Sequence, residues 1–456
     1  MFVELSQADI GQELVCIGQV TTFPRGVIQG RFIEPMDRLS QPSLLGLEPT
    51  FGFGDRLGLA TPGHIAALKY GNLQPIFAQQ SVRELSRTQR TAPEVLAAAQ
   101  AGIAACNYTG VWGADADHLK TREDVEMLAA AGFTFFTIDP SAHVQNHADS
   151  LMGDDLESAA QDAVKGGSFE NVSEVESLYL GKTFDLGNGT TIAVKDRAPL
   201  LRANLKYGTA IAYAAQMARW ITDARAGGGA DIEISVDETD SPTTPMEHLF
   251  IGMELKRRGV VATSVAPRFI GEFEKGIDYK GDLARFEEEL RIHVAIARYC
   301  GPYKISVHSG SDKFSIYPAV GRVCGSLLHV KTAGTSYLEA LRVVARTDSA
   351  LFREIVEYSR SRFDTDKASY HISARLGDVQ SASALSANDA EDQYLDQVAG
   401  RQILHVTFGS VLTVGKTESG RLFKEGILEA LHTHADLHSE VLEKHLGKHI
   451  QLLSQG

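Results

Sequence analysis

The 456-residue sequence lacks the features of a secreted or membrane-bound protein. It has four cysteines, and their wide spacing predicts reduced thiols in a reducing compartment rather than a disulfide framework. No apolar run approaches the roughly 18 residues that a membrane helix needs. The first residues carry Glu4 and Asp9, where a signal peptide would have basic residues and an apolar stretch. These absences favour a cytoplasmic protein with no membrane partner.

Positive charge is also scarce. Lys and Arg total 44 against 58 Asp and Glu, so the net charge is −14. Because phosphate backbones are bound by clustered cations, an acidic chain without a basic tail is expected to have no nucleic-acid partner. A small acidic substrate needs only a few local cations and stays compatible with this balance. The 43% hydrophobic and 22% charged residues are typical of a soluble globular enzyme and exclude a disordered chain, a collagen and a coiled coil.

Motifs of nucleotide and acyl-transfer chemistry are missing as well. The sequence has no Walker A pattern, no well-placed G-x-G-x-x-G, no H-E-x-x-H and no G-x-S-x-G. The glycine-rich stretch 227–235 runs into an expected strand rather than a helix, which is the wrong order for a dinucleotide loop. Nucleotide use and serine-based acyl transfer are therefore disfavoured.

The sequence does contain an alternation of short strand-like runs and longer segments with helical periodicity. The expected strands are 57–63, 74–80, 110–117, 133–140, 231–239, 260–269, 303–310 and 327–334. Most are apolar on both faces until a polar cluster at the C-terminal end, as is typical of parallel strands covered by helices. Eight such strands with helical crossovers predict an α/β fold of the (β/α)8 TIM-barrel type, with a doubly wound open sheet as the alternative.

Capping patterns predict where several of the crossover helices begin. Thr244 and Glu247 have the spacing of a capping box, and Thr121 stands before another segment with an apolar face. Ser336 and Glu339 repeat the same spacing after the eighth expected strand. We therefore expect helices to start at these three positions.

Three regions lie outside the simple repeat of a barrel that would occupy 51–345. Residues 141–230, between the fourth and fifth expected strands, predict an inserted helical subdomain at the rim, either a closing lid or a subunit contact. Residues 346–456 predict a C-terminal helical extension that contributes to the site, with a tail whose histidines look solvated. Residues 1–50 predict an N-terminal cover segment.

The active site of such a barrel lies where the strands end and the following loops begin. Carboxylate oxygens with neutral imidazoles suit a divalent cation, which can stabilise an enediolate, and a neighbouring carboxylate can then move protons. Side chains of these kinds gather at the expected strand ends: Asp115, Asp117, His118, Asp139, Asp237, Glu238, Asp240, His308, Ser309, Asp312, Lys313, His329, Lys331 and Thr332, with His371 farther along. A substrate carboxylate could be gripped by Lys313, Lys331 or Arg375.

Several of these residues also have a plainer interpretation. Asp139 precedes Pro140 and could only cap a loop, and Asp115 could only orient one. His308 could be a satisfied structural histidine. His329 lies inside the apolar run LLHV, which favours a packed and hydrogen-bonded role.

Five segments resemble the tagaturonate epimerase family, the metal-dependent tagaturonate/fructuronate epimerases of hexuronate catabolism. The resemblance runs from roughly residue 50 to 420. It is carried by GADADHLK (113–120), TIDPSAHV (137–144), ISVDETDSPTTPMEH (234–248), ISVHSGSDKFSIYP (305–318) and HVKTAGTSYLEALR (329–342). It implies a barrel isomerase that interconverts D-tagaturonate and D-fructuronate with a divalent cation.

The resemblance and the strand-end placement together give a set of expected roles. Asp117 and Asp139 are expected to be catalytic. The expected metal ligands are His118, Glu238, His308 and His371, and the expected substrate-binding residues are Ser309, Lys313, Lys331 and Arg375. Zinc, manganese, cobalt and nickel are all compatible with such ligands. The expected partner is a small-molecule sugar acid, and a homo-oligomer is possible.

The chemistry of this substrate pair favours one mechanism. The carbon that inverts is not next to the ketone, so removing its hydrogen would leave a carbanion that no adjacent carbonyl can delocalise. The hypothesis is therefore retro-aldol cleavage and re-addition, with the metal stabilising the enediolate. A transient-oxidation route is the alternative, although no nicotinamide fingerprint is present.

Two other functions stay open. One is a metal-dependent ketose (fructose or tagatose) epimerase, isomerase or aldolase on the same barrel. The other is a non-catalytic sugar-acid binding protein, against which paired proton carriers beside a metal cluster would argue.

Overall fold

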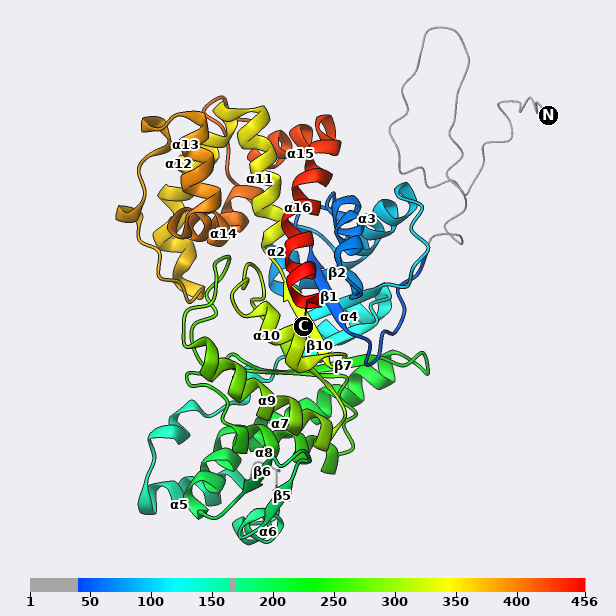
Figure 1. The fold of residues 1–456 in the computed structure, drawn as a ribbon, viewed down its shortest axis with the longest axis vertical. Coiled ribbons are helices and arrows are strands. Elements are labelled where there is room, and N and C mark those ends of the chain that lie inside the picture. Colours follow the sequence, from blue (N-terminus) through cyan, green and yellow to red (C-terminus); the bar gives the residue numbers. More distant parts are fainter. Residues whose placement is uncertain (1–39, 165–168, 456) are drawn as a thin grey trace, which may run out of the picture. The chain divides into compact units, whose positions relative to one another are not determined.

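The structure is a computed structural model that describes residues 40–164 and 169–455 (Figure 1). Eight parallel strands close into a barrel in the order β1-β10-β9-β8-β7-β4-β3-β2, which confirms the predicted (β/α)8 TIM-type fold. The strands are β1 (Thr50–Gly54), β2 (Gln74–Ser81), β3 (Gly113–Leu119), β4 (Phe135–Ile138), β7 (Asp231–Val236), β8 (Ser264–Pro267), β9 (Lys304–Val307) and β10 (Leu328–Thr332).

The first strand lies elsewhere than predicted. The expected strand 57–63 was wrong, because Thr61–Ala67 form helix α1 with a proline in its first turn. The strand is instead β1, where Phe51 and Phe53 are fully buried and the backbone pairs with β10 and β2. Its two glycines lower the strand propensity of this segment and hide it from a pattern search.

Helices cover the outside of the barrel between successive strands. Beside α1 they are α2 (Val82–Thr88), α3 (Ala92–Ala105), α4 (Arg122–Ala131), α7 (Arg197–Ala224), α8 (Pro245–Arg257), α9 (Leu283–Cys300), α10 (Tyr317–Cys324) and α11 (Thr335–Thr347). The capping box expected at Thr244 is present, and the helix expected to start at Thr121 does so, with a capping box to Asp124 that was not predicted. The one expected at Ser336 was wrong: this residue lies inside α11, and its hydroxyl is 2.8 Å from His64 Nε2.

The barrel interior is polar over much of its height, which differs from the expectation of strands apolar on both faces. Alternate residues of each strand point inward. Glu233 of β7, Lys304 of β9 and Lys331 of β10 are all buried there. Because charged groups without partners are expensive inside a protein, Glu233 and Lys331 are paired in an ion network that reaches the carboxyl ends of the strands. The Lys304 ammonium instead donates a hydrogen bond to the Thr50 hydroxyl.

The amino end of the barrel is closed by the segment that precedes β1. Leu45 packs with Ile76 and Phe135 in a small apolar cluster. Its backbone amide donates a 2.7 Å hydrogen bond to the Asp231 carboxylate at the start of β7. Residues 1–39, which make up most of the expected cover segment 1–50 and include Cys16, lie outside the described residues.

The region 141–230 contains more than helices. The long helix α7 is the crossover between β4 and β7 and packs against α4 and α8. The part before it holds α5 (Gly153–Ala163), α6 (Val172–Tyr179) and a hairpin of β5 (Thr183–Asp185) with β6 (Thr191–Ala193). The Lys206 ammonium of α7 is 2.8 Å from Asp149 and 2.7 Å from Ser241, which ties this region to the loop after β7.

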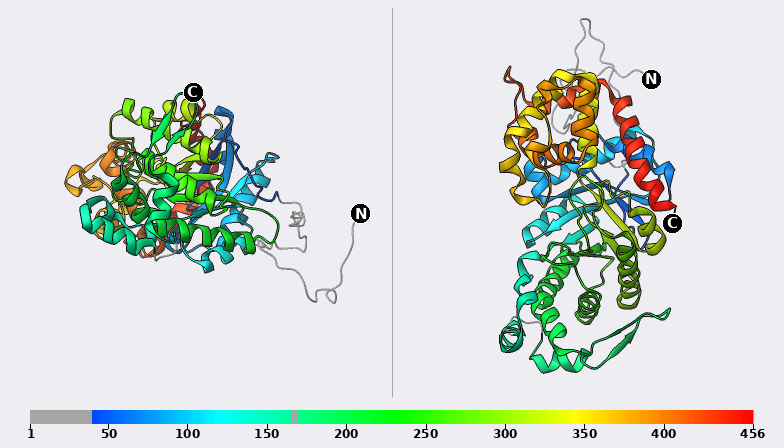
Figure 2. Two further views of the ribbon diagram at one scale, coloured as in Figure 1. Left: turned by 90° about the horizontal axis from the view of Figure 1, so that it is seen from below. Right: turned by 60° about the vertical axis from the view of Figure 1, so that its left-hand side comes forward.

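The chain after α11 forms a helical layer with its own apolar core. It comprises α12 (Ser349–Asp366), α13 (Ala387–Glu391), α14 (Val398–Thr413), α15 (Phe423–Thr433) and α16 (Ala435–Ser454). Helix α16 returns along the barrel and packs against α1, α10 and α11 (Figure 2). The expectation of solvated tail histidines was wrong for His438 and His449, which are buried on the inner face of α16 together with Leu442.

Two features of the described residues bear on the expected environment. None of their helices combines the length and the apolar character needed to cross a membrane. Cys106, Cys300 and Cys324 are free thiols, and the last two are buried.

Candidate active site

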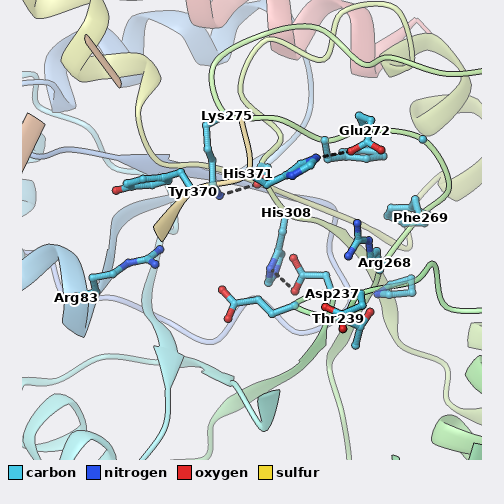
Figure 3. Close-up of a pocket in the computed structure, with 16 residues that line it drawn as sticks. Arg83, Asp237, Thr239, Arg268, Phe269, Glu272, Lys275, His308, Tyr370 and His371 are labelled. Carbon is cyan, nitrogen blue, oxygen red and sulfur yellow. Dashed lines mark hydrogen bonds and ion pairs between the residues drawn. The ribbon is translucent and has the colours of Figure 1, made fainter. Parts of the chain in front are cut away.

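A pocket opens at the carboxyl ends of the barrel strands (Figure 3). It has an outer chamber of about 380 Å³ and an inner chamber of about 60 Å³. The side chains that line both chambers are Arg83, Asp237, Glu238, Lys275, His308 and Ser309. Glu238 and His308, which the sequence placed in one site, therefore share a cavity.

His308 stands at the end of β9 between two carboxylates. Its Nε2 is 2.7 Å from Glu233 Oε1, and its Nδ1 is 3.2 Å from Asp237 Oδ1. Burial lowers the pKa of His308, but the Asp237 and Glu233 carboxylates outweigh this effect and raise it to about 10. The site is thus built to hold positive charge at this position.

His118 lies beside His308, at the end of β3. The two ring centroids are 5.1 Å apart. His118 Nδ1 is 3.3 Å from Asp139 Oδ2, and its Nε2 is 3.7 Å from Asp117 Oδ1. Although burial opposes it, the Asp117 carboxylate and the contact with Asp139 raise the pKa of His118. A donor atom from each of His118, Asp139 and Glu238 lies within 4.8 Å of the other two, so this group could hold a metal ion.

Lys120 shares the outer side of this group. Its ammonium is 3.0 Å from Asp139 Oδ2 and 3.8 Å from Glu238 Oε2. The Asp139 carboxylate also accepts a hydrogen bond from the Ser141 amide, so part of its function is the loop cap that the sequence suggested. A cation at His118 would therefore share these carboxylates with Lys120.

Lys331 forms the floor of the inner chamber. Its ammonium is 2.8 Å from Asp115, 2.7 Å from Asp117 and 2.9 Å from Glu233, and it also contacts the Thr137 hydroxyl. Burial raises the pKa of Asp115 to about 7 against the effect of Lys331. The pKa of Asp117 is held well below its usual range, because Lys331, His118 and His308 outweigh its burial. Asp117 is consequently ionised at neutral pH where it lines the inner chamber.

The opposite part of the pocket carries cations. Lys275, in the loop after β8, donates a 2.6 Å hydrogen bond from its ammonium to the Ser309 hydroxyl. Arg83 of α2 lies beside Tyr370, with its guanidinium carbon 5.7 Å from the ring centroid. Burial lowers the pKa of Lys275.

Other residues predicted for the site lie apart from its inner chamber. His371 lines the outer chamber, where its exposed ring pairs with Glu272 at 2.6 Å. The Lys313 ammonium is surrounded by the backbone carbonyls of Glu274, Ile277 and Ser311, which take up its three donors. Arg375 is exposed and lies outside the lining of both chambers.

Three further strand-end residues named by the sequence have structural partners. Asp312 is buried and paired with Arg401 at 2.7 Å. His329 Nδ1 is 2.8 Å from the Thr50 hydroxyl in the barrel interior, as a packed and hydrogen-bonded role requires. Asp240 lines the outer chamber, and its backbone amide binds Asn146 of the inserted region.

Sequence reasoning missed four residues that shape the pocket. Glu233 could have been found, since it is acidic at an alternate position of the strand DIEISV and must point inward together with Asp231. Arg268 could also have been found, since it directly follows β8 at the end of the expected strand 260–269. Arg83 and Lys275 gave no such signal, because they stand on a short helix and in a loop whose path across the barrel mouth the sequence does not reveal.

The fold and the pocket together define a class of protein. The barrel is closed and parallel, and imidazoles, carboxylates and cations surround a pocket at the carboxyl ends of its strands. This arrangement is that of an enzyme that acts on a small polar molecule. The described pocket is lined by Tyr370, His371 and His405 from the C-terminal helical layer, whereas its lining includes none of the described residues of 141–230.

Comparison with known proteins narrows this class. The family model described as tagaturonate epimerase matches residues 29–453. A tagaturonate/fructuronate epimerase of Thermotoga maritima is 45% identical over 416 residues, which cover 91% of this chain and 82% of the relative. The native crystal structure of the fructuronate-tagaturonate epimerase from Cohnella laeviribosi superposes with a TM-score of 0.85 at 39% identity, covering 91% of this chain and 83% of that one. A glycerol complex of the same Cohnella enzyme gives a TM-score of 0.84.

The chain therefore belongs to the tagaturonate epimerase family, as its sequence segments indicated, and it is an epimerase, a member of the isomerase class of enzymes.

Proposed function

We propose that this enzyme interconverts D-tagaturonate and D-fructuronate with the help of a divalent cation. The observation that carries the proposal is the grouping of His118, Asp139 and Glu238 donor atoms within 4.8 Å of one another. His118 and Glu238 line the inner chamber together with His308, and lysine and arginine side chains line it as well. Membership of the family and the names of its relatives support the choice of substrates.

The donor set fits a divalent cation. Imidazole nitrogens and carboxylate oxygens converge from β3, β7 and β9, and zinc, manganese, cobalt and nickel all accept such ligands. His118, Glu238 and His308 would hold the ion, with Asp237 in contact with His308. Bound there, the cation would supply positive charge for the enediolate formed during the reaction. His371, whose ring is paired with Glu272 at the rim, would join this set only if the loop that carries it moved inward.

The residues of the chain provide the proton transfers. A base takes the proton of the hydroxyl on the carbon that inverts, and the bond between that carbon and its neighbour next to the ketone breaks. The bonding electrons pass to the ketone fragment, and the other fragment becomes an aldehyde. After the aldehyde turns over, the bond re-forms on its other face and the proton returns. Asp117, ionised and lining the inner chamber, or Asp139 would serve as the base.

A reaction in heavy water tests the mechanism. The retro-aldol route keeps the hydrogen on the inverting carbon throughout, so the product should carry no deuterium there. Deuterium at that carbon, measured by proton NMR of the product, would exclude the route. The same spectra, recorded with hexuronates and with neutral ketoses as substrates, identify which sugars are turned over.

Metal content tests the ligand assignment. Glu238→Ala and His308→Ala should each lose bound metal and activity together, while Asp117→Asn should keep the metal and lose turnover. Elemental analysis of the purified variants gives the metal content, and His432→Ala, which removes an exposed imidazole, is the matched control. Full metal content in either ligand variant would show that its assignment is wrong.

A further inference from the structure

Three cations that line the pocket, Arg83, Arg268 and Lys275, form no ion pair with a carboxylate of the described residues, and of these only Arg83 and Lys275 line both chambers. Lys331 contacts three carboxylates and Lys120 contacts two. In contrast, neither the Lys275 ammonium nor the Arg83 guanidinium forms an ion pair with any residue that the structure describes, although the chain has a net charge of −14. The Lys275 side chain is half-buried, and an unpaired ammonium in such a place is unfavourable unless an anion from outside compensates it. Arg83 is exposed and lines the same two chambers.

These two cations lie in the same part of the pocket. Both line the inner and the outer chamber. In the view of Figure 3, Arg83, Tyr370 and Lys275 lie on one side of His308, and Asp237 and Arg268 lie on the other. Lys275 and Arg83 thus place positive charge on one side of His308, where both chambers can be reached.

We propose that Lys275 and Arg83 together bind the carboxylate of the substrate and thereby select ketohexuronates over neutral ketoses. This inference rests on the proposed function, because it assigns the acid group of that substrate to a place in the same pocket. Guanidinium and ammonium groups both form strong charge-assisted hydrogen bonds with a carboxylate. The Ser309 hydroxyl, bonded to Lys275 at 2.6 Å, fixes the position of the ammonium.

The proposed cleavage gives this clamp a second task. In a ketohexuronate one carbon atom lies between the inverting carbon and the carboxylate carbon. The aldehyde fragment is therefore the one that carries the acid group. That fragment must turn over without leaving the pocket. A carboxylate held by Lys275 and Arg83 allows rotation about the bonds that follow it and prevents escape, and the bond then re-forms with no gain or loss of atoms.

Substrate comparison tests the clamp. Lys275→Met and Arg83→Gln should each raise the KM for D-tagaturonate about 10- to 100-fold, the loss expected for a charge-assisted hydrogen bond, and should leave kcat/KM for D-tagatose unchanged. Arg285→Gln is the matched control, because Arg285 is an exposed arginine of α9 outside the lining of both chambers and should leave the KM for D-tagaturonate unchanged. Thermal unfolding of each variant shows that the fold is retained.

Equilibrium binding gives a readout that does not depend on turnover. Calorimetry with D-glycerate, a three-carbon acid, should show binding to the wild-type protein that weakens about 10-fold or more in both clamp variants. Glycerol binding should be the same in all of them. Equal losses for acid and neutral ligands, or a loss of the same size in Arg285→Gln, would overturn the clamp. A wild-type protein that binds D-glycerate through these residues but does not epimerise hexuronates would refute the proposed function and leave the clamp standing.

Discussion

Replacing Lys331 with methionine should destabilise the barrel strongly, because its ammonium is the shared counter-ion of three buried carboxylates. Lys331 is 4% exposed and lies within 2.9 Å of Asp115, Asp117 and Glu233. Methionine fills a similar volume without the charge. Removing one partner of a buried ion pair costs about 3–5 kcal/mol, because the remaining charge stays buried. We expect a loss of unfolding free energy in this range at pH 7.

The loss should depend on pH in a defined direction. The pKa of Asp115 is about 7 even with Lys331 present, and removing Lys331 raises the folded-state pKa values of all three carboxylates. The folded variant therefore binds more protons than the unfolded chain. Stability then falls as pH increases from about 4 toward the raised folded pKa values. The destabilisation of Lys331→Met should therefore be smaller at pH 5.5 than at pH 7.

Urea unfolding followed by circular dichroism at both pH values measures the effect. Lys120→Met is the control, since the Lys120 side chain is 51% exposed and its ion pairs should contribute less than about 1 kcal/mol. A loss below about 1 kcal/mol for Lys331→Met at pH 7, or one that does not change with pH, would refute the view that the barrel depends on this ion network.

Three further substitutions test the packing of the C-terminal helices. Asp312→Asn should cost about 3–5 kcal/mol by urea unfolding at pH 7, because it leaves the Arg401 guanidinium buried without its partner. Although burial opposes it, Arg401 holds the pKa of Asp312 well below its usual range. The contribution of Asp312 to stability is therefore present above about pH 4 and is lost as the pH falls. The acid branch of the stability curve should be shallower in this variant. Gly321→Ala would place a methyl group 1.9 Å from the Leu453 carbonyl oxygen, and we expect a loss of about 1–3 kcal/mol in thermal unfolding. Leu442→Ala should cost about 2–5 kcal/mol in urea, because this side chain is fully buried between α16 and α1; a loss below that range would show that α16 is dispensable for the barrel.

Local patterns were sufficient to predict most of the barrel. Seven expected strands overlap observed ones, and helices begin directly after Thr121 and Thr244, as predicted. Strand burial patterns and helix starts depend on residues that are close in the sequence, so a local pattern can predict them. The first strand was missed because the glycines of TFGFG give it a low strand propensity. Burial between β2 and β10 stabilises the strand in spite of this low propensity.

The site was predictable only where the strands themselves carry it. Asp117, His118 and His308 stand at strand ends, and the barrel topology alone brings their loops together. Lys313 follows a strand too, yet its ammonium turns to backbone carbonyls of the loop after β8. Lys275 belongs to that same loop and reaches the pocket instead. The direction of a loop side chain depends on contacts between segments that are distant in sequence, and no local pattern contains them.

The position of α16 has a consequence for how the protein forms in the cell. The last barrel strand ends at Thr332, whereas the helix that covers α1 and α10 begins at Ala435. During synthesis all eight strands leave the ribosome before Leu446 and Ile450 are available to cover the outer wall of the barrel. The faces of α1 and α10 that α16 covers are therefore synthesised before their cover exists, which makes the docking of α16 a late step in the folding of the chain.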